Sequence, residues 1–436
     1  MGIVSNFKAA TDIDRMKSRF QKEIDRFLGK EGELKYLYIP RAFPRNDGGF
    51  SISYNLIIDK TEKGEEKIIL WGHLLGLDQT LPGKTLAPRQ DLIIFDDIGL
   101  VVPVFPYDPK LKYLPDFVVT GKPKKRLGAI PFLAGKKFDV IECRLLGYRL
   151  ERRCVFEYTL DMKQNDGIER IKVVAKIARP KKIAAALKIF EKFSATEMTA
   201  DSSDGLTVPE YLGCDNDHGI ILMEFVSGRS LHSLIGNRSF PESCHEAGRL
   251  IRKLHSISLG DLPYYTADDE LDSLSKIVDI INSVFPELGE AFGDAYSGIT
   301  RGRIGDDYAV GPVHRDFYDK QTLHSPGRAT LLDFDNMALS DPALDYGNFM
   351  AHLDLRRYQS PENEMMIIDG SEAFVSGYES AGKEFTKRVN WWRAAALLRL
   401  AGLYSLRPRW KSIAKNLLLE INSSQEGKNI LSGEKR

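Results

Sequence analysis

The sequence predicts an α+β protein whose body has a β-rich lobe and a helical lobe, with an additional β-rich domain in front of them. Three observations lead to this prediction. Short runs of β-branched and aromatic residues lie between Gly49 and Asp97, a second β-rich stretch begins near Phe138, and helical periodicity dominates after Gly228. A chain of 436 residues is long enough for more than one core, on the prior of about 150 residues per domain.

Residues 1–125 are expected to form the accessory domain. Residues 12–30 have the apolar spacing of an amphipathic helix, carried by Ile13, Met16, Phe20, Ile24 and Phe27. Three β-rich runs separated by turn-forming residues then predict an antiparallel sheet, and they cover Gly49–Lys60, Glu65–Leu75 and Asp91–Asp97. The polar, basic run Gly121–Lys125 contains Gly and Pro, so we take it as the seam to the next unit.

Residues 126–226 are expected to form the β-rich lobe and residues 227–422 the helical lobe. In the first, strands are predicted in FDVIECRLLGYRL, RRCVFEYTLD, IERIKVVAKIAR, VPEYLGCD and GIILMEFVSG, with a helix over Lys181–Phe193. In the second, helices are predicted in ESCHEAGRLIRKLHSI, DSLSKIVDIINSVF and RVNWWRAAALLRLAGLYSL. Residues 423–436 are polar and predict a disordered tail.

Composition excludes several classes of protein. Lys and Arg number 61 and balance 61 Asp and Glu, so no nucleic acid or other polyanion is expected as a partner. The four cysteines form no CxxC pair and predict reduced thiols rather than a disulfide scaffold or a zinc site. No apolar stretch approaches the roughly 18 residues of a membrane span, and the start has no apolar signal region. We therefore expect a cytoplasmic protein with no membrane partner, and the sequence does not indicate its oligomeric state.

The segment with the clearest chemistry is VHRDFYDKQTLHSPGRATLLDFDNMALSDPALDYGNF, residues 313–349. Asp316 follows His314 by two positions, Gln321 lies five residues further, and Asp333 ends an apolar strand. This is the order of the catalytic loop and metal ligand in phosphoryl-transfer enzymes. Asp316 would orient the acceptor hydroxyl and take its proton, while Gln321 and Asp333 would supply oxygen ligands to magnesium. The alternative is that these acids only cap turns, and His314 is expected to support the loop through hydrogen bonds.

Lys176 supplies a second, independent signal. It lies inside the β-branched strand KVVAKIAR, where a charge is costly unless it has an anionic partner such as a nucleotide phosphate. An edge-strand lysine in solvent is the alternative. Glu191 on the following helix is the predicted partner of Lys176, although Glu197 is nearly as eligible and either could be a surface glutamate.

The segment LMEFVSGRSL fits a linker between the two lobes. An apolar strand leads into Glu224, Phe225 and Val226, whose backbone groups could bind the edge of an adenine. Gly228 would then permit the turn into the helical lobe. A strand followed by an ordinary loop would look the same, so this prediction depends on the position of the segment between Lys176 and Asp316.

Together these motifs resemble the aminoglycoside phosphotransferase and choline kinase superfamily, over about residues 135–420. HRDFYDKQ is similar to the Brenner motif HGDxxxxN, LLDFDN to the metal-binding segment, and KLHSI, with His255, to the LxxLH helix. In DPALDYGNF, Asp345 would be the structural aspartate that holds the catalytic loop. The resemblance implies a bilobal protein-kinase-like fold that uses ATP or GTP with Mg²⁺.

The chain departs from that family pattern at three places. Gln321 stands where Asn is usual, and Arg315 replaces a common Gly. No GxGxxG is present, so the candidate phosphate loop is Gly147–Arg153. Its arginines Arg149, Arg152 and Arg153 would either contact phosphates or form a solvated hairpin tip.

The predicted function is transfer of a γ-phosphoryl group to a hydroxyl of a small molecule. About a dozen residues separate Asp333 from Asp345 and no APE motif follows, which argues against a protein kinase. The N-terminal part weakly resembles maltokinase-like proteins, which implies a sugar, amino sugar or related acceptor. The alternatives are a nucleotide-binding pseudokinase or regulatory module without transfer activity, and a kinase-like shell that serves only as an interaction platform.

Overall fold

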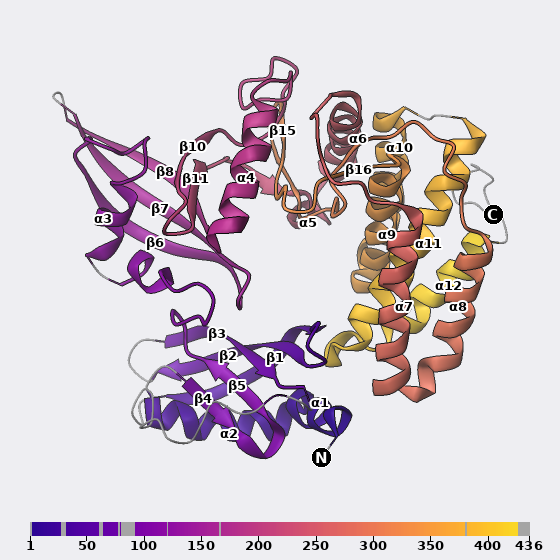
Figure 1. The fold of residues 1–436 in the computed structure, drawn as a ribbon, viewed down its shortest axis with the longest axis horizontal. Coiled ribbons are helices and arrows are strands. Elements are labelled where there is room, and N and C mark those ends of the chain that lie inside the picture. Colours follow the sequence, from indigo (N-terminus) through magenta and orange to yellow (C-terminus); the bar gives the residue numbers. More distant parts are fainter. Residues whose placement is uncertain are drawn as a thin grey trace.

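The computed structural model describes residues 2–27, 32–60, 64–76, 79, 92–119, 121–164, 167–379 and 382–425. These residues form an N-terminal domain, a β-rich N-lobe and a helical C-lobe, and in Figure 1 the N-terminal domain lies beneath the N-lobe and beside the lower end of the C-lobe. The predicted α+β, bilobal arrangement with an additional β-rich domain is therefore confirmed.

The N-terminal domain has two helices packed on a five-stranded antiparallel sheet of order β1-β2-β3-β5-β4. Its elements are α1 (Ile3–Thr11), α2 (Ile13–Phe27), β1 (Glu33–Pro44), β2 (Phe50–Lys60), β3 (Gly64–Leu74), β4 (Leu92–Phe95), η1 (Asp96–Ile98) and β5 (Leu100–Pro103). The ring of Phe20 on α2 packs 4.9 Å from that of Tyr54 on β2, between ring centroids, so the apolar stripe of the helix covers one face of the sheet.

Strand β1 was absent from the sequence prediction, and it contains two prolines, which are uncommon in strands. The structure accommodates Pro40 at the edge of the sheet, where the register with β2 shifts between Tyr38 and Arg41. A bulged edge strand is one of the few sheet positions that tolerate proline. The predicted helix end at residues 28–30 and the strand start at Asp91 lie outside the described residues.

The N-lobe is a five-stranded antiparallel sheet of order β10-β11-β8-β7-β6 with helix α4 packed beside it. Its elements are β6 (Phe138–Arg149), β7 (Arg153–Gln164), β8 (Gly167–Ala178), α4 (Pro180–Phe193), β10 (Tyr211–Asp215) and β11 (Ile220–Glu224). Each of the five predicted strands and the helix lies within a few residues of its expected position.

The seam predicted at Gly121–Lys125 is a short helix, α3 (Lys122–Leu127), which follows the 3-10 turn η2 (Leu114–Phe117). Pro123 occupies the first turn of α3, where its missing N–H costs nothing. Pro123 and Leu127 are buried, and Leu127 belongs to the hydrophobic cluster of the N-lobe sheet. Because that cluster also contains Leu111, we propose that the domain boundary lies between Pro103 and Leu111 rather than at residue 125.

The C-lobe is mostly helical, with α9 and α11 packed together at its centre. Its helices are α5 (Leu231–Leu234), α6 (Phe240–Ser256), α7 (Ala267–Val284), η3 (Pro286–Leu288), α8 (Gly289–Arg301), α9 (Ala343–Gln359), η4 (Pro361–Asn363), α10 (Glu364–Tyr378), α11 (Lys383–Ser405), η5 (Pro408–Trp410) and α12 (Ile413–Gln425). Helix α12 continues three residues past the predicted start of the tail at residue 423, and residues 426–436 lie outside the described part of the chain.

Two small sheets at the junction of the lobes carry the predicted catalytic segment. One has the order β12-β14-β15-β9 and the other pairs β13 with β16. Their strands are β9 (Leu206–Thr207), β12 (Arg229–Ser230), β13 (Gly311–Val313), β14 (Thr322–Ser325), β15 (Arg328–Leu331) and β16 (Ala338–Ser340). Residues 314–321 therefore form the loop from β13 to β14, and Asp333 follows β15.

Candidate active site

The loop of residues 314–321 is held at its start by Asp345, near the beginning of α9. The fully buried carboxylate of Asp345 accepts hydrogen bonds from the backbone N–H of His314 (2.6 Å) and of Arg315 (2.7 Å). Its third partner is His255 at the end of α6, whose Nε2 lies 3.1 Å away. Asp345 thus has the loop-holding position that the sequence predicted for it.

His314 supports the loop from inside, as expected from the sequence. Its Nε2–H donates to the carbonyl of Leu332 (2.8 Å), and its Nδ1 accepts from the backbone N–H of Asp316 (3.3 Å). With both ring nitrogens engaged and the side chain fully buried, His314 cannot reach a substrate.

Arg315, which replaces a glycine of the family pattern, has a φ of +66°. A left-handed backbone explains why glycine is usual here, and it costs a non-glycine residue of the order of 1 kcal/mol. The guanidinium group of Arg315 lies 3.6 Å from the ring centroid of Tyr265, a cation–π contact that helps to offset this cost.

Asp316 is the carboxylate at the turn of the loop. Burial raises its pKa, and the positive charge of Arg399 opposes part of that rise. The amide Nε2 of Gln321 lies 3.3 Å from Oδ2 of Asp316 and donates to it. This contact orients the carboxylate and leaves the amide oxygen of Gln321 for another partner.

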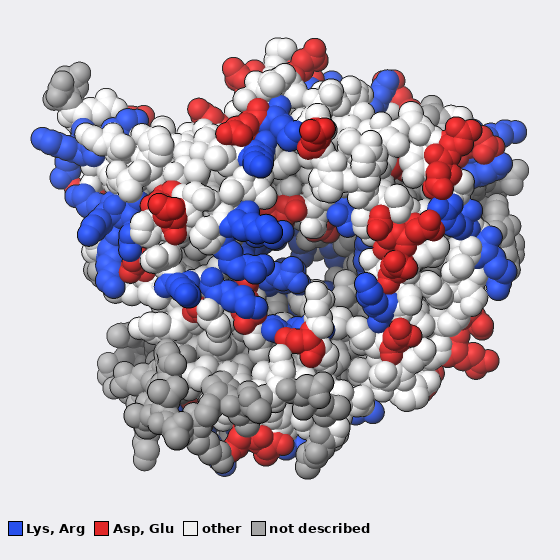
Figure 2. Space-filling model, in the orientation of Figure 1, with Lys and Arg blue, Asp and Glu red and all other residues white. Residues whose placement is uncertain are grey.

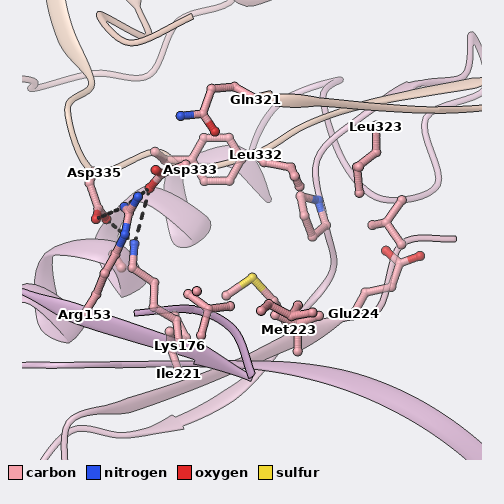
Figure 3. Close-up of a pocket in the computed structure, with 18 of the residues that line it drawn as sticks. Arg153, Lys176, Ile221, Met223, Glu224, Gln321, Leu323, Leu332, Asp333 and Asp335 are labelled. Atoms are coloured by element: carbon pink, nitrogen blue, oxygen red, sulfur yellow. Dashed lines mark hydrogen bonds and ion pairs between the residues drawn. The ribbon is translucent and has the colours of Figure 1, made fainter. Parts of the chain in front are cut away.

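Gln321 and Asp333 come to the same end of the β14–β15 hairpin. The backbone N–H of Leu332 donates to the carbonyl of Gln321 (2.8 Å), which sets the two side chains beside each other, as Figure 3 shows. Asp333 has a φ of +65°, so the chain bends sharply where the carboxylate leaves the strand.

Two cations from the N-lobe meet the carboxylates of Asp333 and Asp335 (Figure 3). Nη1 of Arg153 lies 2.7 Å from Oδ1 of Asp333 and 3.1 Å from Oδ2 of Asp335. Lys176 Nζ lies 3.6 Å from Oδ1 of Asp333 and forms a salt bridge with Asp335. Burial alone would raise the pKa of Asp333, but the positive charges of Lys176 and Arg153 outweigh burial and lower it. Asp333 is therefore ionised, as a metal ligand must be.

The predicted pair of Lys176 with Glu191 does not form. Glu191 is exposed on α4, and Glu197 after that helix is exposed as well. The face of α4 that borders the site presents Ala186 and Phe190 instead. Helical spacing alone could not reveal which face turns inward, and Asp335 takes the place of the helix glutamate as the partner of Lys176.

A cavity of about 430 Å³ joins these groups to the linker between the lobes. This volume is within the range of small-ligand sites, about 300 to 1,000 Å³. Apolar side chains from both lobes form its walls, among them Val155, Val174, Ile221, Met223, Leu323 and Leu332. The walls suit a flat, uncharged ring system with a charged group at the Asp333 end.

The predicted linker residues Glu224, Phe225 and Val226 line the other end of this cavity. The Glu224 carboxylate is bound by both terminal nitrogens of Arg328 (2.8 and 3.0 Å), so its side chain holds the linker rather than a ligand. The ladder between β11 and β8 ends at the pair of Glu224 with Val173, which leaves the next backbone groups without a strand partner.

The hairpin tip between β6 and β7 is part of the site. Arg149 and Arg153 line the cavity, whereas Arg152 is exposed and lies outside its lining. The solvated-tip interpretation is therefore wrong for Arg149 and Arg153. Sequence reasoning also missed Arg41 on β1, which lines the same cavity from the N-terminal domain, and it treated Asp335 only as a possible substitute for Asp333. Asp335 stands in the LLDFDN segment and could have been found there, while Arg41 has no local signal.

A model of the phosphotransferase enzyme family, APH, matches residues 164–381 of the chain. The matched segment is half of the 436 residues. The chain belongs to this family. The match covers Lys176, the linker and the loop of residues 314–321, and this agrees with the predicted superfamily. No curated protein matches the sequence.

Solved structures of phosphotransferases are similar to this chain. A choline/ethanolamine kinase family protein from Mesorhizobium loti is 16% identical with a TM-score of 0.44, covering 70% of this chain and 94% of its own. The ternary complex of APH(2″)-IIa with streptomycin and ATP is 14% identical with a TM-score of 0.44, covering 69% and 96%. Amicoumacin kinase hAmiN, in complex with AMP-PNP, Ca²⁺ and Ami, is 13% identical with a TM-score of 0.44, covering 70% and 93%.

The donor set at this site fits a hard cation such as Mg²⁺. Asp333 and Asp335 supply carboxylate oxygens and Gln321 an amide oxygen, which are the ligand types that Mg²⁺ prefers. No cluster of three or more His, Cys, Asp or Glu side chains suited to a metal occurs among the described residues, so the protein alone offers an incomplete shell. Mg²⁺ in phosphoryl-transfer sites is typically held by one or two carboxylates together with substrate phosphates.

Within the described part of the chain, no helix is both long and apolar enough to cross a membrane.

Proposed function

We propose that the protein transfers the γ-phosphoryl group of ATP or GTP to a hydroxyl of a small molecule, with a sugar, amino sugar or related compound as the leading acceptor. One observation carries the proposal. Gln321, Asp333 and Lys176 meet at one end of a cavity whose other end is the linker, and Gln321 hydrogen-bonds Asp316. Phosphoryl transfer needs little beyond such positioning and charge neutralisation.

Asp316 is the proposed catalytic base. Its half-buried carboxylate has a raised pKa, so it is a better proton acceptor than an exposed aspartate. The hydrogen bond from Gln321 fixes one carboxylate oxygen and leaves the other for the acceptor hydroxyl.

The nucleotide would lie with its base at the linker and its phosphates at Lys176 and Arg153. Backbone groups of Glu224, Phe225 and Val226 would bind the edge of the base. The cations now paired with Asp333 and Asp335 would turn to phosphate oxygens, which are equally good partners for a guanidinium group. Asp333 and the amide oxygen of Gln321 would hold Mg²⁺, and bound Mg²⁺ would neutralise phosphate charge.

A nucleotide-binding protein without transfer activity is the second candidate. Two observations favour it. Arg153 and Lys176 form salt bridges with the carboxylates of Asp333 and Asp335, and the sequence contains no glycine-rich GxGxxG loop that could cover the phosphates. In this case the cations would remain on the aspartates and the acceptor side would have no role.

The test is release of nucleoside diphosphate in a coupled assay over sugars, amino sugars, aminoglycosides and amino alcohols. Asp316→Asn should reduce turnover by about 10² or more and leave nucleotide affinity within a few fold, because the carboxylate acts only in the chemical step. Turnover of the native protein should also decline on the acid side, with an inflection above the ordinary aspartate pKa of about 4. Equal turnover in the Asn variant would exclude Asp316 as the base.

A further inference from the structure

The two lobes and the N-terminal domain meet at the ring of Phe43 on β1. The guanidinium group of Arg149, at the N-lobe hairpin tip, lies 4.5 Å from the centroid of this ring. That of Arg407, which follows α11 in the C-lobe, lies 5.7 Å from the same centroid. One aromatic side chain of the N-terminal domain therefore brings together cations from both lobes.

Two further cations extend this group toward the proposed base. Arg41 precedes Phe43 by two positions on β1 and lines the cavity together with Arg149. Lys320 lies in the loop of residues 314–321, next to Gln321. We call Arg41, Arg149, Lys320 and Arg407 the junction cations. Figure 2 shows basic side chains gathered around the hollow at the centre of this face.

Among the described residues, no salt bridge joins a junction cation to a carboxylate, although the nearby charge of Asp316 favours the Arg149 cation. This distinguishes them from Arg153 and Lys176, which both form salt bridges with Asp333 and Asp335. The Nε of Arg407 is also buried without a hydrogen-bond partner. An unsatisfied buried donor is costly, and a positive group in a hollow without a salt-bridge partner fits an anionic ligand.

The like charges make this arrangement unfavourable in the absence of a ligand. Burial lowers the pKa of Arg149 to about 10, and the neighbouring charges of Arg152, Arg153 and Arg41 contribute. Burial also lowers the pKa of Arg407, and the charge of Arg41 acts in the same direction. Arg41 is thus electrostatically close to Arg149 and Arg407, and an anion bound among them would relieve the repulsion.

We propose that the junction cations form an anion subsite for the acceptor, and that the acceptor is a small hydroxyl compound bearing a phosphate or carboxylate group. This proposal rests on the function proposed above and specifies its substrate class. An acceptor is favoured over the nucleotide tail because Lys176 and Arg153 already serve the Asp333 end, while Lys320 and Arg407 lie outside the cavity lining. A planar guanidinium group binds either anion through paired hydrogen bonds.

The binding test needs no catalysis. Inorganic phosphate is titrated by calorimetry into the full-length protein saturated with AMP-PNP and Mg²⁺. Phosphate should bind beside the nucleotide analogue, and Arg41→Ala should weaken it by about tenfold or more, as expected for one lost charge-assisted hydrogen bond. Arg41→Lys should recover part of the affinity because the charge survives without the planar fork.

Arg152→Ala is the matched control, since it removes an exposed arginine from the same hairpin tip outside the cavity lining. Phosphate affinity of this variant should stay within about twofold of the native value. Arg41→Ala and Arg152→Ala should both keep the native melting temperature. Absence of phosphate binding, or binding only when AMP-PNP is left out, would overturn the proposal, because the second result assigns the cations to the nucleotide tail.

Acceptor kinetics distinguish this proposal from the function on which it rests. Glucose, glucose 6-phosphate and glucuronate are compared as acceptors in the native protein and in Arg41→Ala. The anionic compounds should have the lower KM, and Arg41→Ala should raise their KM about tenfold more than it raises that of glucose. Transfer to glucose with no preference for the anions overturns the acceptor subsite alone. If no acceptor is phosphorylated but phosphate still binds beside AMP-PNP, the transfer function fails and the anion site stands.

Discussion

Two buried aspartates organise two loops of the site in the same way. Asp345 accepts hydrogen bonds from the backbone N–H groups of His314 and Arg315 and so holds the loop of residues 314–321, the proposed catalytic loop. Asp108 accepts from the backbone N–H of Glu151 (2.8 Å) and the hydroxyl of Tyr148 (2.9 Å) and so holds the β6–β7 tip. Each carboxylate accepts hydrogen bonds from donors that would be costly to bury without a partner.

The difference between them lies in where each aspartate comes from. Asp345 belongs to the C-lobe, the same unit as its loop, whereas Asp108 lies in the segment between the N-terminal sheet and the N-lobe. That segment and the N-terminal sheet also supply Lys110, whose Nζ lies 2.6 Å from Glu151, and Trp71, whose Nε1 donates to the carbonyl of Tyr148 (2.9 Å). The loop of residues 314–321 is therefore held by residues of its own lobe. The hairpin tip, in contrast, is held by residues outside the N-lobe and depends on docking of the N-terminal domain.

Asp345→Asn should have the largest effect. The amide cannot accept from two backbone N–H groups and His255 as a carboxylate does, so the loop loses charge-assisted hydrogen bonds worth about 1–3 kcal/mol in total. We expect turnover to fall by about 10² because the position of Asp316 is lost, and the melting temperature to drop by several degrees. Steady-state kinetics and calorimetric melting measure both.

If Asp345→Asn lowered turnover without lowering the melting temperature, the comparison of Asp345 with Asp108 as loop-holding residues would be wrong. Asp345 would then act on the chemistry directly rather than through the loop. Tyr378→Phe serves as a milder control, because it removes only the hydroxyl that contacts Nδ1 of His255 (2.8 Å). Its effect on both quantities should be a small fraction of that of Asp345→Asn.

Gln321 tests whether the catalytic loop also supplies a metal ligand. If its amide oxygen binds Mg²⁺, Gln321→Asn should keep substantial activity, because only one methylene is lost, and Gln321→Leu should lose about tenfold or more and require more Mg²⁺. Turnover is measured against Mg²⁺ concentration for both variants, beside their melting temperatures. An active Leu variant with the native Mg²⁺ requirement would leave Gln321 with only its hydrogen bond to Asp316.

Asp108→Asn should have a smaller and more local effect than Asp345→Asn. Loss of the carboxylate frees the tip that carries Arg149 and Arg153, so nucleotide affinity should fall about three- to tenfold while turnover at saturation stays within a few fold. Hydrogen exchange should rise in residues 147–153 and remain unchanged in residues 314–321. Equal exchange in both segments would show that the two loops are not independent.

The same contrast explains how much of the protein could be predicted from its sequence. The proximity of Asp316, Gln321 and Asp333 was predictable because they stand in one continuous segment, and spacing along the chain fixes their relation. The N-lobe strands were predictable because hydrophobic runs and turn residues are local signals. These features require no knowledge of how distant segments pack.

What the sequence did not reveal depends on long-range packing. Arg41 reaches the cavity only because the sheet of the N-terminal domain docks under the lobes, and Asp108 meets the tip across 43 residues of chain. Strand β1 was missed because a bulge, which is a property of the pairing with β2, accommodates Pro40. Glu191 was misassigned because helical periodicity does not fix the rotation of α4 about its axis.

Glu191 gives the smallest expected effect and tests that misassignment. In the structure Glu191 is exposed on α4, and Lys176 pairs with Asp335 and Asp333. Glu191→Gln should therefore change nucleotide affinity and turnover by less than about twofold, as for other exposed side chains without a partner at the site. Lys176→Met is the matched variant, and it should weaken nucleotide binding by about tenfold or more, because it removes the ammonium group but keeps the buried stem. Affinity is measured by titration with AMP-PNP and Mg²⁺. A loss in Glu191→Gln as large as in Lys176→Met would mean that α4 rotates when nucleotide binds and that the helix glutamate then replaces Asp335. Lys176 would in that case exchange its C-lobe partner Asp335 for a partner in its own lobe, and the contact between the lobes at this end of the cavity would depend on the nucleotide.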